Sequence, residues 1–113
     1  MGVGGAPVTP VDRQGNVVGG SAAAAAWDGS DVTSPYSEAV VEVSGLSGGD
    51  TIVVSGKMTD AATAQPMTGI ALDFTTVSTI TEDGIYSYSN PGTVSYAQTG
   101  SASTPTVTIL ARS

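Results

Sequence analysis

The sequence predicts an all-β protein: an antiparallel β-sandwich or a small jelly-roll-like barrel with an extended N-terminal arm. Two observations support this. From residue 38 onward, short runs rich in Val, Thr and Ile alternate with turns that contain Gly or Pro. No segment shows a sustained helical period. Regularly spaced short strands with such turns are typical of sandwiches and small barrels.

The expected strands follow one another closely along the C-terminal two thirds of the chain. The first two are separated by the Gly-rich stretch 46–50, and we expect them to form a hairpin. Turns are also expected at 82–84 and at 90–92, where Pro and Gly favour turn geometry. The expected strands are 39–45, 51–57, 68–77, 85–89, 93–99 and 106–113, with 78–81 as a continuation or a separate short strand.

Alternation along these strands predicts which side chains face the core, because successive residues of a strand point to opposite faces. For the valines at 40/41 and 53/54 the choice of face stays open, since a slip of one residue would exchange them. The inward candidates are Val41, Val43, Ile52, Val54, Ile70, Leu72, Phe74, Ile80, Tyr86, Tyr88, Val94, Tyr96, Val107 and Ile109.

The first part of the chain, residues 1–37, has a different composition. It holds seven Gly, three Pro and the alanine run 22–26, and its apolar residues follow no period. This favours an extended arm in residues 1–37 and a β-sandwich domain in residues 38–113. A flexible tail is the alternative. Trp27 and Tyr36 favour an arm ordered by a partner, since large aromatic side chains are costly to leave in water.

The charge balance argues against nucleic acid and membrane as direct partners. Only 12% of the residues are charged, against about 25% in typical domains. Three basic residues face ten carboxylates, and the net charge is −7. Such a chain cannot neutralise a row of phosphates, and it has no basic cluster for anionic lipids. No signal peptide is evident and the alanine run is too short to span a membrane, so we expect the protein to be made and assembled in the cytoplasm.

The chain has neither Cys nor His, which excludes thiol nucleophiles, His bases, ordinary zinc sites and disulfides. We therefore expect no enzyme, no catalytic residue, no cofactor and no metal. Asp28 and Asp31 flank a Gly-Ser turn that could offer oxygens to calcium, but a turn-forming role is expected. Glu82-Asp83 is expected to serve the turn at Gly84. Lys57 is expected to be a solvated strand end.

Three tyrosines, Tyr86, Tyr88 and Tyr96, suggest a second kind of function. They lie on neighbouring expected strands, and as an exposed strip they could stack against sugars. The more common arrangement places such side chains in the core or at the rim of the sheet. A carbohydrate-binding β-sandwich module therefore stays an alternative.

Three pieces of the chain share a recognisable layout: Val43–Gly56, Thr79–Tyr88 with "TITEDGIYSY", and Val94–Ser113 with "TGSASTPTVTILARS". In these pieces the chain from residue 41 onward resembles small β-sandwich virion proteins of tailed bacteriophages. The N-terminal third has no counterpart in this layout. The resemblance implies a structural, non-enzymatic component of the particle.

Within that family, a capsid decoration or cement protein on the capsid exterior is the leading hypothesis. Its partners would be the major capsid protein and neighbouring copies of itself, and a homotrimer is plausible at three-fold positions. A tail, neck or head-fibre component is the alternative within the particle. The expected anchors of the arm on its partner are Val8, Val11, Val17, Val18, Trp27 and Tyr36.

Overall fold

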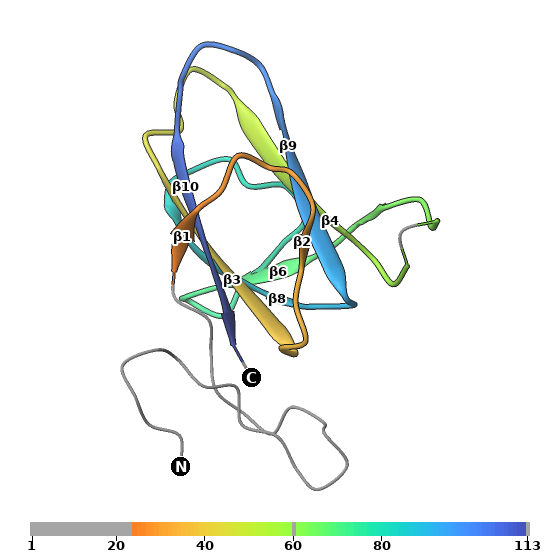
Figure 1. Ribbon diagram of the computed structural model, residues 1–113. Coiled ribbons are helices and arrows are strands. Elements are labelled where there is room, and N and C mark those ends of the chain that lie inside the picture. Colours follow the sequence, from red (N-terminus) through yellow and green to blue (C-terminus); the bar gives the residue numbers. More distant parts are fainter. Residues whose placement is uncertain (1–23, 60, 113) are drawn as a thin grey trace, which may run out of the picture.

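The computed structural model describes residues 24–59 and 61–112. In these ranges the chain is all β, with two antiparallel sheets that face each other (Figure 1), so the prediction of a β-sandwich is confirmed. No helix in them is long and apolar enough to cross a membrane. The strands are β1 (Ala25–Ala26), β2 (Val32–Thr33), β3 (Glu38–Ser44), β4 (Thr51–Lys57), β5 (Gln65–Pro66), β6 (Gly69–Ala71), β7 (Thr76–Val77), β8 (Gly84–Ser89), β9 (Thr93–Thr99) and β10 (Thr106–Arg112).

The larger sheet has the strand order β1-β10-β3-β8-β6-β7, and the smaller one has β2-β9-β4-β5. The predicted hairpin of β3 and β4 is therefore wrong, because the two strands lie in different sheets. β3 pairs with β10 and β8, and β4 pairs with β9. Both strands bury alternate valines or isoleucines, and these side chains meet across the core instead of lying side by side on one sheet.

The core follows the alternation expected for two packed sheets. Val41 on β3 and Ile52 on β4 are both fully buried, and Ile80 joins them. Ile80 also forms an isolated bridge with Ile52 that links the chain before β8 to the smaller sheet. Gly69 on β6 lies against Tyr88, and a Cβ there would stand 2.6 Å from atoms of the tyrosine ring. Only glycine lets the β6 backbone approach this ring so closely.

The boundary predicted at residue 37 is too late for the part of the arm that the structure describes. β1 pairs with β10 and β2 pairs with β9, so residues 25–33 extend both sheets. Trp27 is buried in the core, where its ring meets the ring of Tyr96 edge to face at 4.8 Å between centroids. The free energy gained by burial of this large ring offsets the conformational entropy that is lost when a segment with low strand propensity becomes ordered. Residues 1–23 lie outside the described residues.

At one end of the sandwich a buried carboxylate, that of Asp50, links two loops by hydrogen bonds. Asp50 is 3% exposed and ends the connection from β3 to β4. It accepts hydrogen bonds from the backbone N–H of Ser103 at 2.6 Å, the Ser103 hydroxyl at 2.7 Å and the N–H of Ala102 at 3.2 Å. The Ser103 hydroxyl is the main cause of a lowered pKa for Asp50. The carboxylate therefore ties the β3–β4 connection to the loop between β9 and β10.

Candidate functional site

The exposed large apolar side chains of the described residues gather mainly at the β6–β7 hairpin, residues 69–77. Ile70 is 49% exposed, Leu72 71% and Phe74 87%, and Met58 on a separate loop is also exposed. The prediction that Ile70, Leu72 and Phe74 face the core is therefore wrong. Single exposed apolar residues are common, but three within five positions form a patch that calls for an explanation.

The predicted strand 68–77 folds back on itself, which explains the exposure. β6 ends at Ala71, and β7 returns antiparallel beside it. The N–H of Ala71 donates to Thr75 O, and the N–H of Phe74 donates to Ala71 O. Asp73 Oδ1 accepts from the Thr75 N–H at 3.1 Å and from its hydroxyl at 2.6 Å. An aspartate bonded to the backbone two residues on forms a local turn that competes with a continuous strand.

Phe74 adopts a backbone conformation that is unusual for its residue type. Its φ is +67°, and it is the non-glycine residue with positive φ in the described ranges. The left-handed region costs an L-residue roughly 1–2 kcal/mol. Phenylalanine has no side-chain hydrogen bond to offset this cost, so the hydrogen bonds of the turn must hold the conformation. The result is an apolar ring presented to solvent on a fixed backbone.

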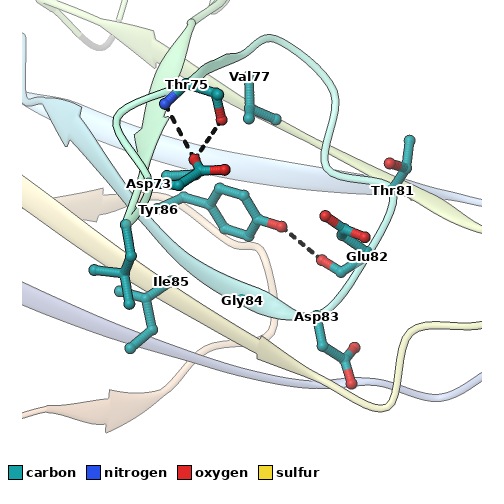
Figure 2. A pocket seen from close by; sticks show the side chains of 11 residues that line it. Asp73, Thr75, Val77, Thr81, Glu82, Asp83, Gly84, Ile85 and Tyr86 are labelled. Carbon is teal, nitrogen blue, oxygen red and sulfur yellow. Dashed lines mark hydrogen bonds between the residues drawn. The ribbon is translucent and has the colours of Figure 1, made fainter.

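A cleft of about 270 Å³ lies beside this hairpin (Figure 2). The side chains of Val77 and Tyr86 give it apolar walls, and Leu72 lines it from the hairpin. The Tyr86 hydroxyl donates to the backbone carbonyl of Glu82 at 2.7 Å. The residues that line the cleft are Ala71, Leu72, Asp73, Thr75, Val77, Thr81, Glu82, Asp83, Gly84, Ile85 and Tyr86.

The cleft is negatively charged, since Asp73, Glu82 and Asp83 line it and no basic residue does. The Thr75 hydroxyl holds the pKa of Asp73 below its usual value. The N–H groups of Gly45 and Leu46 do the same for the pKa of Asp83, so both carboxyls are ionised at neutral pH. Burial raises the pKa of Tyr86, and the charges of these three acids add to the effect. Tyr86 is therefore a neutral phenol in an acidic setting.

The expected arm anchors fall into two groups. Trp27 and Tyr36 are buried within the sandwich, so their side chains are not presented to a partner as predicted. Trp27 Nε1–H donates to Ser30 O at 2.8 Å, and the Tyr96 hydroxyl donates to Trp27 O at 3.1 Å. The remaining predicted anchors, Val8, Val11, Val17 and Val18, lie outside the described residues.

The acidic turn and the lysine considered from sequence have structural roles. Asp28 Oδ1 accepts from the N–H and the hydroxyl of Ser30, which builds the expected turn. Lys57 is not a solvated strand end: its side chain is 15% exposed, and its Nζ lies 3.0 Å from Asp31 Oδ2. In the described ranges no group of three or more His, Cys, Asp or Glu is placed to hold a metal ion.

The tyrosine strip considered for sugar binding is not exposed. Tyr86 and Tyr88 are buried in the core, and Tyr96 packs against it at partial burial. Burial raises the pKa of Tyr88 to about 12. A stacking platform needs exposed ring faces, so these tyrosines are core residues, as the more common arrangement predicted.

Sequence reasoning missed the apolar hairpin as a surface. The signal that could have found it is Asp73 two residues before Thr75, which is a turn pattern inside an otherwise alternating run. Alternation of Ile70, Leu72 and Phe74 was read as a buried strand face because the two arrangements share this pattern over three positions.

Comparison with known proteins places the fold. No family model matches the chain, and no curated protein matches it in sequence. The crystal structure of the SPBc2 prophage-derived protein YomS aligns with a TM-score of 0.72 and 14% identity over 86% of this chain and 96% of YomS. The PBSX exported protein XepA aligns with a TM-score of 0.57 and 23% identity over 80% of this chain. The match covers only 32% of XepA. At these identities both matches show likeness of fold alone: this chain has the fold of YomS and of a part of XepA.

Proposed function

We propose that the protein is a structural, non-enzymatic component of a bacteriophage particle, and specifically a decoration protein on the outside of the head shell. The observation that carries the proposal is the β6–β7 hairpin, which exposes Leu72 and Phe74 on a hydrogen-bonded turn. A backbone that is already hydrogen-bonded into a turn has less conformational entropy to lose when a partner covers its side chains. This is the property of a contact surface.

The fold and the composition support the phage setting. Two proteins of prophage origin share the sandwich, and fold likeness is an argument by analogy. Only 12% of the residues are charged, and the buried centres of protein interfaces are depleted in charge. A shell subunit that is covered by neighbours on several sides fits this composition.

The hairpin alone does not give stable attachment. Full burial of Leu72 and Phe74 yields about 1.5–3 kcal/mol each, whereas association costs about 4–15 kcal/mol in lost freedom of motion. Further contacts are needed, and we propose the arm as their source, with Val8, Val11, Val17 and Val18 as anchors. The major capsid protein and neighbouring copies of this chain are the proposed partners.

Co-sedimentation tests this function. Heads from phage that lack the protein are mixed with the purified chain and pelleted. We expect binding that saturates at a fixed number of copies per head, and weaker binding after deletion of residues 1–23. The deletion ends before Ala24, because β1 begins at Ala25 and belongs to the sandwich. Absence of the wild-type protein from the pellet would contradict the proposal.

Immunogold labelling of phage particles that carry the protein shows where on the particle it binds. A decoration protein labels the whole head surface. Label confined to one vertex or to the tail would replace this assignment with a neck, head-fibre or tail component.

A further inference from the structure

The β6–β7 hairpin and the cleft beside it form one continuous surface, which we call the hairpin cleft. Leu72 belongs to both, since it is 71% exposed and also lines the cleft. Phe74 stands next to it on the turn and is the most exposed of the large apolar residues. An occupant of the cleft would therefore touch Leu72, and a neighbouring residue of the same occupant would reach Phe74.

The walls of the cleft differ from its rim. Val77 and the ring of Tyr86 offer apolar contact, whereas Asp73 and Glu82 supply carboxylates around it (Figure 2). The Asp83 carboxylate points away from the Tyr86 ring and accepts from the N–H groups of Gly45 and Leu46. A lysine or arginine side chain has the same division, with an aliphatic stem and a charged head. The stem would lie on the apolar walls while the head approaches the carboxylates. Arginine fits best, because its planar fork can bond two carboxylate oxygens at once.

The charge of the cleft is not compensated by this chain within the described ranges. Their two basic residues are paired elsewhere: Lys57 with Asp31, and Arg112 with Glu38 at 2.6 Å. Neither lines the cleft. Two carboxylates at the rim of a partly apolar cleft, Asp73 and Glu82, therefore favour a cationic occupant.

The same charge argues against a second copy of this chain as the occupant. The ring of Phe74 from another copy would bring the adjacent Asp73 with it, and two acidic clefts placed face to face would repel. The overall charge of −7 adds to this repulsion. The occupant must come from a chain of different composition.

We propose that the hairpin cleft binds a segment of a partner protein that carries a basic side chain next to an apolar one. The basic side chain enters the cleft between Val77, Tyr86 and the carboxylates, and the apolar neighbour covers Leu72 and Phe74. Where the proposed function holds, this segment belongs to the head-shell protein, and in that respect the inference rests on it.

The test separates the two proposals by using two probes. The first is the peptide acetyl-Leu-Arg-Leu-amide, titrated into the ¹⁵N-labelled full chain and followed by NMR, with acetyl-Leu-Glu-Leu-amide as its matched control. We expect shifts confined to residues 70–86 with the arginine peptide and at least five-fold weaker effects with the glutamate peptide. The second probe is the head preparation described above.

Three variants complete the design. Leu72→Ser removes apolar contact, and Glu82→Lys reverses the charge of a side chain that makes no hydrogen bond to residues 24–59 or 61–112. Each is expected to weaken binding of the arginine peptide and of heads at least five-fold. Met58→Ser is the control, since Met58 is similarly exposed but lies outside the cleft, and it should change binding less than two-fold. Unchanged amide spectra away from the cleft verify the fold.

Each outcome decides one proposal. Peptide binding that depends on Leu72 and Glu82, without head binding, supports the cleft and contradicts the decoration role. Head binding that is unchanged in both Leu72→Ser and Glu82→Lys supports the decoration role and overturns the proposal for the hairpin cleft. Equal binding of both peptides, or no binding of either, also overturns it. Shifts at residues 70–86 that grow with protein concentration in the absence of peptide would show that a second copy is the occupant, and would overturn it as well.

Discussion

Two turns of this molecule are each held by an aspartate that accepts backbone N–H groups, yet one turn buries its leucine and the other exposes it. In the β3–β4 connection, Asp83 accepts the N–H groups of Gly45 and Leu46 at 2.9 and 2.8 Å. In the β6–β7 hairpin, Asp73 accepts the N–H of Thr75. Each turn carries a leucine next to these bonds. Leu46 is 8% exposed, whereas Leu72 is 71% exposed.

The difference lies in the origin of the aspartate. Asp83 comes from a segment 37 residues further along the chain than Leu46, so its hydrogen bonds form only when the sandwich does, and they pull the turn onto the core. Asp73 bonds to a residue two positions away, so the hairpin turn is built locally and needs no core contact. A turn that is independent of the core can hold apolar side chains in solvent, and this is what a contact surface requires.

Truncation of the two leucines should separate the turns most strongly. We expect Leu46→Ala to lower the free energy of unfolding by about 2–5 kcal/mol, because it leaves a cavity in the core. Leu72→Ala should change it by less than about 0.5 kcal/mol, because the side chain is exposed. Urea denaturation followed by Trp27 fluorescence measures both. Equal losses would show that Leu72 packs against the domain, and the comparison would fail.

A smaller difference in stability is expected when two carboxylates are changed. These are Asp50, at the end of the β3–β4 connection, and Asp73 in the hairpin. Asp50→Asn replaces one acceptor oxygen with a donor that faces the N–H of Ser103 or Ala102. Because Asp50 is buried, the urea midpoint at pH 7 should fall clearly. Asp73→Asn keeps one acceptor for Thr75 in an exposed turn, and its midpoint should fall less. The reverse order would contradict the distinction.

The pH dependence of stability is a second test of the role of Asp50. The folded-state pKa of Asp50 is lowered from 3.8, chiefly by the Ser103 hydroxyl. A lowered pKa means that the stabilisation is fully present above the unfolded value and is lost as the pH falls through the folded one. The wild-type urea midpoint should therefore drop as the pH falls below 3.8, and Asp50→Asn should flatten this drop. An equally steep drop in the variant would assign the pH dependence to other acids.

The long strands could be predicted from the sequence because their burial alternates over many residues. β4 and β9 were predicted at their observed bounds, 51–57 and 93–99, and the positions of β3, β8 and β10 were predicted to within one residue at each end. The pairing of strands could not be predicted in the same way. Alternation shows which face of a strand is buried, but it does not show which sheet the strand joins, so β3 and β4 were wrongly paired.

The candidate surface escaped prediction for a related reason. Over three positions, Ile70, Leu72 and Phe74 show the period of a buried strand, and only the Asp73–Thr75 turn breaks it. Trp27 and Tyr36 were assigned to a partner because the segment around them has weak strand propensity and large aromatic side chains are costly to leave in water. The large burial of Trp27 overrides that propensity, and this is a tertiary effect that local composition does not reveal.

The smallest expected effect on stability is at Phe74, and its sign is informative. Glycine adopts φ of +67° without the cost of roughly 1–2 kcal/mol that phenylalanine bears there. Glycine also makes the unfolded chain more flexible, which costs about 0.5–1 kcal/mol. Since the ring is 87% exposed, its removal loses little packing. Phe74→Gly should therefore raise the free energy of unfolding by up to about 1 kcal/mol.

The same variant should weaken binding to heads, because the exposed ring is gone. Phe74→Ala is the matched control: it removes the ring but keeps the backbone strain, so it should weaken binding equally without a gain in stability. Urea denaturation and co-sedimentation of the three proteins measure both quantities. A loss of stability in both variants would mean that the ring packs on its own domain. A gain in stability together with weaker binding would show that Phe74 is held in an unfavourable conformation for the sake of contact, as a surface built for a partner requires.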